Sequence, residues 1–321
     1  MANLPHQAIT EQDIKRLVQD YLIKSLPLKQ KFIGVSQFQE ENMSCNFFGQ
    51  SDLLIVSHCK LHELSINILR RLPIYLVREF AIQVEYDSFW FWALTNDIVN
   101  RSLITPQLRD WELQDGFKAL MAANFAKLNV HQQGVPSLER LNRATSEIVS
   151  QPVKDLVDSR DVFLMYICYP VLEGLAKFAL SPLIDCDGNP LATFRAGHDI
   201  FHKGSRKINS LAKILRALEE NGSAVLSKPD ISNNLRDFRL EIDKIISASS
   251  PTDDGWDSIY DLRNASLHGV KGFQLRSGLL TNLICLILWN ILDDQTLTKE
   301  LQMINKIPMR FLGNNYYPPE L

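Results

Sequence analysis

The stretch LLTNLICLILWNIL, residues Leu279 to Leu292, is the most apolar part of the chain. It is about 14 residues long, whereas a helix needs about 20 mostly apolar residues to span a bilayer. Three polar residues, Thr281, Asn282 and Asn290, also interrupt it. We therefore expect a helix buried in the core of a folded protein, and no membrane partner.

Helical periodicity dominates the second half of the chain, where apolar residues recur at helical spacing. Gly, Pro and Ser clusters separate the predicted helices. Pro170 is expected to kink the first of them, because proline removes a backbone hydrogen bond and clashes with the preceding turn. The predicted fold class is mainly α, with helices at Val153 to Leu180, Gly197 to Asn221, Ile231 to Ala248, Asp254 to Leu267 and Phe273 to Leu292.

The first half of the chain also contains helical patterns, but residues 30 to 85 leave helix and strand open. The dense aromatic cluster Phe89 to Trp92 is expected to be buried. The segment Val130 to Ser137 contains Gly and Pro and is typical of a linker or long loop. We therefore predict two regions: residues 1–150, mostly helical with short strands, and residues 151–321, a helical bundle.

Composition limits the classes of function. With 321 residues and 45% hydrophobic content, the chain can bury a substantial core. A formal net charge of -3 and a charged fraction of 22% exclude a protein that coats polyanions through bulk charge, so any nucleic-acid site must be local. The five cysteines form no CxxC pair, and the N-terminus lacks the pattern of a signal peptide. These features predict a cytoplasmic protein.

The segment YDLRNASLHG, Tyr260 to Gly269, contains an arginine, an asparagine directly after it, and a histidine five positions after the arginine. This arrangement resembles the signature of the HEPN family (higher eukaryote and prokaryote nucleotide-binding). A long helix upstream and a strongly apolar helix after the histidine also resemble the HEPN helical bundle. The resemblance covers roughly residues 150 to 295, and we identify no family in the first 150 residues.

Arg263 and His268 can share a site only if the helix ends near them. On an unbroken helix, positions five apart are separated by about 140° around the axis. Gly269 and Gly272 are typical helix terminators, so we expect His268 in the last turn or beyond it, able to converge with Arg263. A helix C-terminus also favours the protonated imidazole, which keeps a proton available near neutral pH.

An imidazole that exchanges protons beside a guanidinium that neutralises a phosphate is sufficient to cleave RNA without a metal or cofactor. His268 would act as general acid or base, Arg263 would hold the scissile phosphate, and Asn264 could orient either group. The HEPN resemblance implies an endoribonuclease, a prokaryotic toxin or defence effector, whose site forms across a homodimer. If the bundle instead binds its partner without turnover, the first half of the chain could sense a trigger or bind an antitoxin.

Other interpretations stay open. Arg263 lies four residues after Ile259, at the edge of the apolar stripe, and could pair with a carboxylate. Glu173 and Asp257 are the candidate partners. His268 would then only cap helix carbonyls. Many HEPN domains are also thought to be noncatalytic, so the bundle could bind RNA, a nucleotide or a protein without turnover, or be a scaffold with no site.

The stretch Arg195 to Arg216 holds six Lys or Arg residues against one acid, Asp199. We predict a basic helix here. Lys203, Arg206 and Lys207 are its candidate contacts to an RNA backbone, because phosphate contacts supply most nonspecific affinity. A solvated helix face would explain the same composition.

Two histidine pairs, His58 with His62 and His198 with His202, have the spacing of metal ligands on one helix face. Neither pair has the glutamate of an HExxH motif or an evident third ligand, so no metal site is predicted. The chain also lacks a P-loop, a GxGxxG motif after a strand and a GxSxG motif. Their absence argues against nucleotide hydrolysis, dinucleotide binding and the usual serine hydrolases.

Overall fold

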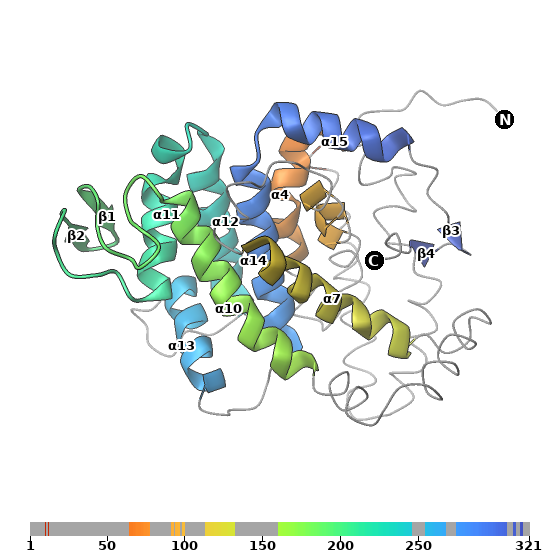
Figure 1. Ribbon diagram of the computed structural model, residues 1–321, viewed down its shortest axis with the longest axis horizontal. Coiled ribbons are helices and arrows are strands. Elements are labelled where there is room, and N and C mark those ends of the chain that lie inside the picture. The colour runs from red at the N-terminus through yellow and green to blue at the C-terminus, as the bar shows by residue number, and fades with distance from the viewer. Residues whose placement is uncertain are drawn as a thin grey trace.

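The computed structural model describes residues 64–77, 113–131, 160–245, 254–267 and 274–306, with a few shorter segments. Its described part is mostly helical, which confirms a mainly α protein (Figure 1). The helices are α4 (Ile66–Leu76), α7 (Leu113–His131), α10 (Arg160–Ala179), α11 (Leu211–Val225), α12 (Asp230–Ile245), α13 (Gly255–Leu267), α14 (Gln274–Ile291) and α15 (Asp294–Lys306). The strands form two antiparallel hairpins, β1 (Phe194–Ala196) with β2 (Asp199–Phe201) and β3 (Phe311–Leu312) with β4 (Asn315–Tyr316).

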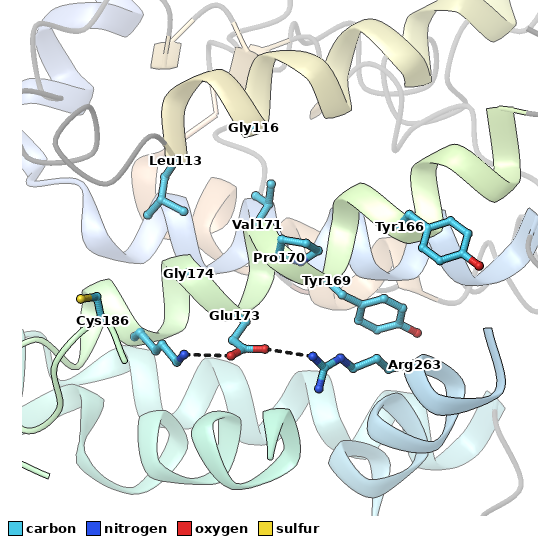
Figure 2. Close-up of a pocket in the computed structure, with 11 residues that line it drawn as sticks. Leu113, Gly116, Tyr166, Tyr169, Pro170, Val171, Glu173, Gly174, Cys186 and Arg263 are labelled. Atoms are coloured by element: carbon cyan, nitrogen blue, oxygen red, sulfur yellow. Dashed lines mark ion pairs between the residues drawn. The ribbon is translucent and has the colours of Figure 1, made fainter. Parts of the chain in front are cut away.

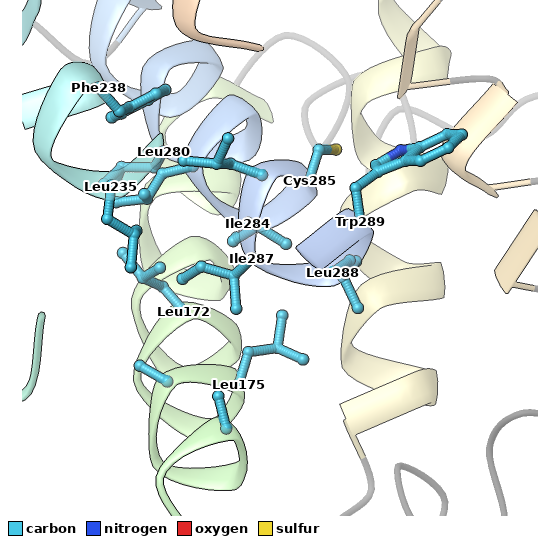
Figure 3. Packing of buried hydrophobic residues seen from close by; sticks show 14 of the residues in the cluster. Leu172, Leu175, Leu235, Phe238, Leu280, Ile284, Cys285, Ile287, Leu288 and Trp289 are labelled. Carbon is cyan, nitrogen blue, oxygen red and sulfur yellow. The ribbon is translucent and has the colours of Figure 1, made fainter. Parts of the chain in front are cut away.

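Helix α14 lies at the centre of the described bundle. Every residue from 279 to 290 is buried, so the expectation of a core helix is confirmed. Helix α10 packs along it with Leu172 and Leu175, and α12 contributes Leu235 and Phe238 (Figure 3). Helix α4 packs against another part of its surface. Because α14 is surrounded, the helices around it are fixed relative to one another.

None of the described helices is by itself long and apolar enough to span a membrane. Ser277–Ile291 and Asp294–Met303 satisfy the requirements of length and composition only when taken together, and they are bent by 110° at the break between them.

The polar residues that interrupt the apolar run have hydrogen-bond partners inside the core. The Asn282 side-chain oxygen accepts from Trp92 Nε1 at 2.7 Å, and the Asn290 oxygen accepts from Asn234 Nδ2 at 3.1 Å. The Thr281 hydroxyl donates to a carbonyl one turn earlier at 2.8 Å. Buried polar groups are costly unless paired, so these bonds fix the rotation of α14 against its neighbours.

Residues from the first half of the chain join this same core. Phe91 and Trp92 of the aromatic cluster are fully buried, as expected, whereas Phe89 and Trp90 lie outside the described residues. Phe91 stacks on Trp289 with ring centroids 5.6 Å apart. Part of the ambiguous range 30 to 85 is helix, since α4 lies within it. The predicted boundary near residue 150 lies outside the described residues and stays a prediction.

The predicted helices agree with the structure except in one place. Helices α12, α13 and α14 follow the predicted ranges, and α10 contains Pro170 in its interior. The helix predicted from Gly197 to Asn221 is wrong in its first half, because residues 194–201 form the β1–β2 hairpin and α11 begins only at Leu211. Gly197 has φ 66°, which suits the first position of a two-residue hairpin turn and ends any helix.

Helix α13 is held in place by a cluster of ion pairs among α11, α12 and its own N-terminus. Glu219 accepts from Arg239 at 3.0 and 3.2 Å and from Trp256 Nε1 at 2.7 Å. Asp254 accepts from the Trp256 backbone N–H at 2.9 Å, which caps the first turn of α13, and it pairs with Arg216 at 2.9 Å. Charge-assisted bonds to α11, and through Arg239 to α12, therefore fix the position of α13.

Truncation of a side chain in α14 should destabilise the whole bundle. We expect Leu283→Ala to lower the free energy of unfolding by about 2–5 kcal/mol, because Leu283 is fully buried and its loss leaves a cavity. Leu240→Ala is the matched control, since Leu240 is 44% exposed and its change should stay within about 0.5 kcal/mol. If urea unfolding showed the same loss of unfolding free energy for both variants, the central position of α14 would be contradicted.

Candidate functional site

Arg263 lies on α13 and faces α10. Its Nη2 atom is 3.6 Å from Oε2 of Glu173, and the other oxygen of Glu173 accepts Lys177 Nζ at 2.8 Å. The three side chains form a row of two cations and one carboxylate between the helices (Figure 2). The suggested pairing with Glu173 is therefore confirmed, whereas Asp257, the other suggested partner, pairs with Arg216.

This row of charges lies in a pocket with a volume of about 620 Å³. Helices α7, α10 and α13 and the turn after α10 contribute to its walls. The lining residues are Leu113, Gly116, Tyr166, Tyr169, Pro170, Val171, Glu173, Gly174, Lys177, Cys186 and Arg263. A mostly apolar cavity with a few converging charges is the usual form of a ligand site.

Close approach of α7 and α10 shapes one wall of the pocket. A Cβ atom added to Gly174 would come within 2.4 Å of Leu113 Cδ2, so the Leu113 side chain would have to move. Leu113 is buried at the start of α7. The glycine therefore lets the Leu113 side chain pack directly on α10 beside Glu173, and this contact forms part of the apolar wall of the pocket.

The pocket has a positive charge balance. Lys177 and Arg263 carry two positive charges against the single negative charge of Glu173. The exposed fractions of their side chains are 13% for Lys177, 22% for Glu173 and 30% for Arg263, so water screens them less than surface charges. The 3.6 Å contact between Arg263 and Glu173 is longer than a hydrogen bond. The site is therefore suited to an anion that approaches Arg263 from the pocket.

The other two residues of the predicted motif are placed only in part. Asn264 follows Arg263 on α13 and is half-buried. Helix α13 extends to Leu267, in agreement with the predicted helix range. His268 lies outside the described residues, so its convergence with Arg263 stays a prediction.

The basic residues Lys203, Arg206 and Lys207 lie in the loop between β2 and α11, and the prediction of a basic helix is wrong here. All three are exposed. Arg206 reaches Asp199 at 3.5 Å, and Asp199 is also paired with Lys213 of α11 at 2.5 Å. Within the described part of the chain, Lys203 and Lys207 form no ion pair with a carboxylate. We call residues 202–210 the basic loop.

The histidine pair His198 and His202 does not share a helix face, because the two residues belong to the β1–β2 hairpin and the start of the basic loop. His202 Nδ1 is 3.2 Å from the Thr193 hydroxyl. The pair His58 and His62 lies outside the described residues. Among the residues that the structure describes, no group of three or more His, Cys, Asp and Glu is arranged to hold a metal ion.

The sequence reasoning missed Lys177 and Tyr166 as site residues. The signal was present, because Tyr166, Pro170, Glu173 and Lys177 recur at helical spacing and so share one face of α10. All four line the pocket. Of this face, only Glu173 was identified, as a candidate partner of Arg263, because the sequence does not show that the whole face lies opposite Arg263.

No protein-family model, curated protein or solved structure matches this chain. The fold and the pocket therefore define the class of protein directly. It is a mainly helical protein with a positively charged pocket between α10 and α13.

The described cysteines should differ sharply in reactivity. Burial raises the pKa of the Cys168 thiol to about 12 and also raises the pKa of Cys285, whereas Cys186 is exposed at the pocket. Because the thiolate is the reactive form, iodoacetamide at pH 8 should alkylate Cys186 and spare the two buried thiols in the native protein. Peptide mass spectrometry with and without denaturant checks this. If Cys168 in the native protein were alkylated as fast as Cys186, the packing of α10 against α14 would be contradicted.

Proposed function

We propose that this protein is a metal-independent endoribonuclease of HEPN type, in which Arg263 holds the scissile phosphate and His268 transfers protons. The supporting observation is the position of Arg263. It lines a pocket together with Lys177, and the charged side chains of this pocket have a net positive charge. A guanidinium offers several N–H donors to phosphate oxygens and stays charged at all relevant pH values.

The reaction needs only groups that this chain supplies. The RNA 2′-hydroxyl loses its proton to a general base and attacks the adjacent phosphorus, and the bond to the 5′-oxygen breaks as a general acid protonates that oxygen. The products are a 2′,3′-cyclic phosphate and a 5′-hydroxyl end. His268 serves as the acid or the base, and the second copy of His268 in the proposed homodimer takes the other role. Arg263 stabilises the added negative charge on the phosphorane oxygens.

Glu173 has a clear part in this proposal. Its carboxylate lies between Arg263 and Lys177 and holds both cations beside the pocket before any phosphate arrives. A phosphate that enters can replace the 3.6 Å contact of Arg263 while Lys177 keeps Glu173 neutralised. Asn264, half-buried next to Arg263, would orient the phosphate or the imidazole.

The biological setting of the proposal follows from the resemblance to HEPN domains. We propose a homodimer with two copies of the motif facing each other, acting in the cytoplasm as a toxin or defence effector. The first half of the chain would bind an antitoxin or another regulatory protein. RNA is the proposed substrate.

A noncatalytic binding module is the second candidate. The observation that favours it is the ion pair between Arg263 and Glu173, which gives the arginine a structural role without any chemistry. In that case the pocket would bind RNA, a nucleotide or a protein segment without turnover.

The deciding experiment incubates labelled RNA with purified protein in EDTA. We expect the wild type to produce fragments with cyclic phosphate ends, and His268→Ala to lower the cleavage rate at least about 100-fold, since general acid–base catalysis contributes about 10²–10⁴-fold. Arg263→Ala should lose about 10²–10³-fold through loss of transition-state stabilisation.

Arg236→Ala is the matched arginine control, because the Arg236 side chain is 55% exposed on α12. Its cleavage rate should equal that of the wild type. Lack of cleavage by every protein, or cleavage only after Mg²⁺ is added, would refute the proposal. Expression should also slow the growth of a host, and His268→Ala should restore it.

The basic loop should supply the sequence-independent part of RNA affinity. In the His268→Ala background, we expect Lys203→Glu with Lys207→Glu to weaken binding and to lower the slope of log affinity against log salt by about one per lost phosphate contact. Lys299→Glu, an exposed position on α15, is the control and should change neither quantity. If the slope of log affinity against log salt were unchanged in the double variant, the basic loop would not contact the RNA.

A further inference from the structure

An aromatic side chain stands at one end of the pocket. Tyr166 lines the pocket and is 46% exposed, although large aromatic rings are usually buried. Figure 2 shows the rings of Tyr166 and Tyr169 at the end of the pocket where Arg263 enters, while Cys186 lies at the other end. A half-exposed ring at the Arg263 end of the pocket offers a flat apolar surface near a phosphate-binding group.

The pocket therefore combines two features that single-stranded nucleic acids need. Base faces stack on aromatic side chains, and the backbone follows a row of positive charges. Here Tyr166 of α10 supplies the ring, and Arg263 of α13 and Lys177 of α10 supply two positive charges on either side of Glu173. From Tyr166 to Lys177 the helix rises about 16 Å, so the ring and Lys177 are well separated along the pocket.

The other end of the pocket leads to the basic loop. Cys186 belongs to the turn at residues 185–190, and the Gly188 carbonyl in that turn accepts the Ile208 N–H at 2.9 Å. Lys207 is close enough to add to the lowering of the Asp185 pKa, which hydrogen bonds from Asn189 mainly cause. The turn thus places Lys207 of the basic loop near Asp185, next to Cys186 at this end of the pocket.

The contact between this turn and the basic loop is tight. Gly188 has φ 85°, and a Cβ atom there would lie 2.5 Å from the Ile208 carbonyl oxygen. The turn and the basic loop therefore hold a defined spacing.

We propose that the pocket binds one unpaired RNA nucleotide, with its base stacked on Tyr166 and its backbone passing Lys177 toward Lys207 and Lys203. This inference rests on the proposed function and names its substrate class as single-stranded RNA. In an A-form duplex the bases are stacked inside and present no free face to a tyrosine, so a duplex cannot fill the pocket.

Binding to uncleaved RNA tests this proposal separately from catalysis. The protein is full-length His268→Ala, and the probes are a short fluorescent single-stranded RNA and the same strand annealed to its complement. We expect the single strand to bind at least about tenfold more tightly than the duplex. Adding Tyr166→Ala should weaken single-strand binding about tenfold, the effect of losing one base stack, and leave duplex binding unchanged.

Two further variants make the test specific. Phe163→Ala removes a ring that is 43% exposed on the same helix but does not line the pocket, and it should change neither affinity. Tyr166→Phe keeps the stacking surface and should retain most of the single-strand affinity. Thermal unfolding of all variants should match that of the parent, because the altered rings are about half exposed.

The outcomes separate the two proposals. Equal affinity for single strand and duplex, or equal effects of Tyr166→Ala and Phe163→Ala, would overturn the pocket inference, even if the wild type cleaves RNA. Single-strand binding that depends on Tyr166, together with a wild type that cleaves nothing, would uphold the pocket inference and reject the nuclease.

Discussion

Burial of α14 on all sides is the constraint on which the described structure depends. A helix with no exposed face between residues 279 and 290 has to be enclosed by α4, α10 and α12, and its buried asparagines fix how far it can rotate. Helix α10 uses one face for this contact, with Leu172 and Leu175 pointing inward. Its opposite face, with Tyr166, Glu173 and Lys177, is left for the pocket. The packing of α10 against α14 therefore determines which face of α10 is available to line the pocket.

A second set of contacts turns that face into a site. Helix α13 brings Arg263 opposite Glu173 only because Glu219 and Asp254 hold its first turn against α11 and α12. These carboxylates are half-buried or nearly buried, so their bonds to arginine are stronger than those of exposed pairs. The ion pairs around Glu219 therefore hold α13 in position. Those around Glu173 lie in a cavity with room for a ligand.

The spacing of apolar residues was enough to predict most of the helices, but it could not show which helix faces meet at the pocket. The spacing of apolar residues in α12, α13 and α14 identified these helices, because burial of one face imposes that spacing. The segment at residues 197–210 was misassigned because its basic residues, Lys203, Arg206 and Lys207, fit a helix as well as a loop, while the informative residue was Gly197 in its hairpin turn. Arg263 and Glu173 were both identified, yet Lys177 and Tyr166 were not, since their importance depends on which helix faces α10.

The position of α14 in the chain has a consequence for synthesis. Helices α4, α7, α10, α11 and α12 all leave the ribosome before Gln274, the first residue of the helix that fills their shared centre. Until then the inward faces at Leu172, Leu175 and Leu235 have no partner, and such exposed apolar surface promotes aggregation. The inward faces of these helices therefore stay exposed in the growing chain until α14 has been synthesised.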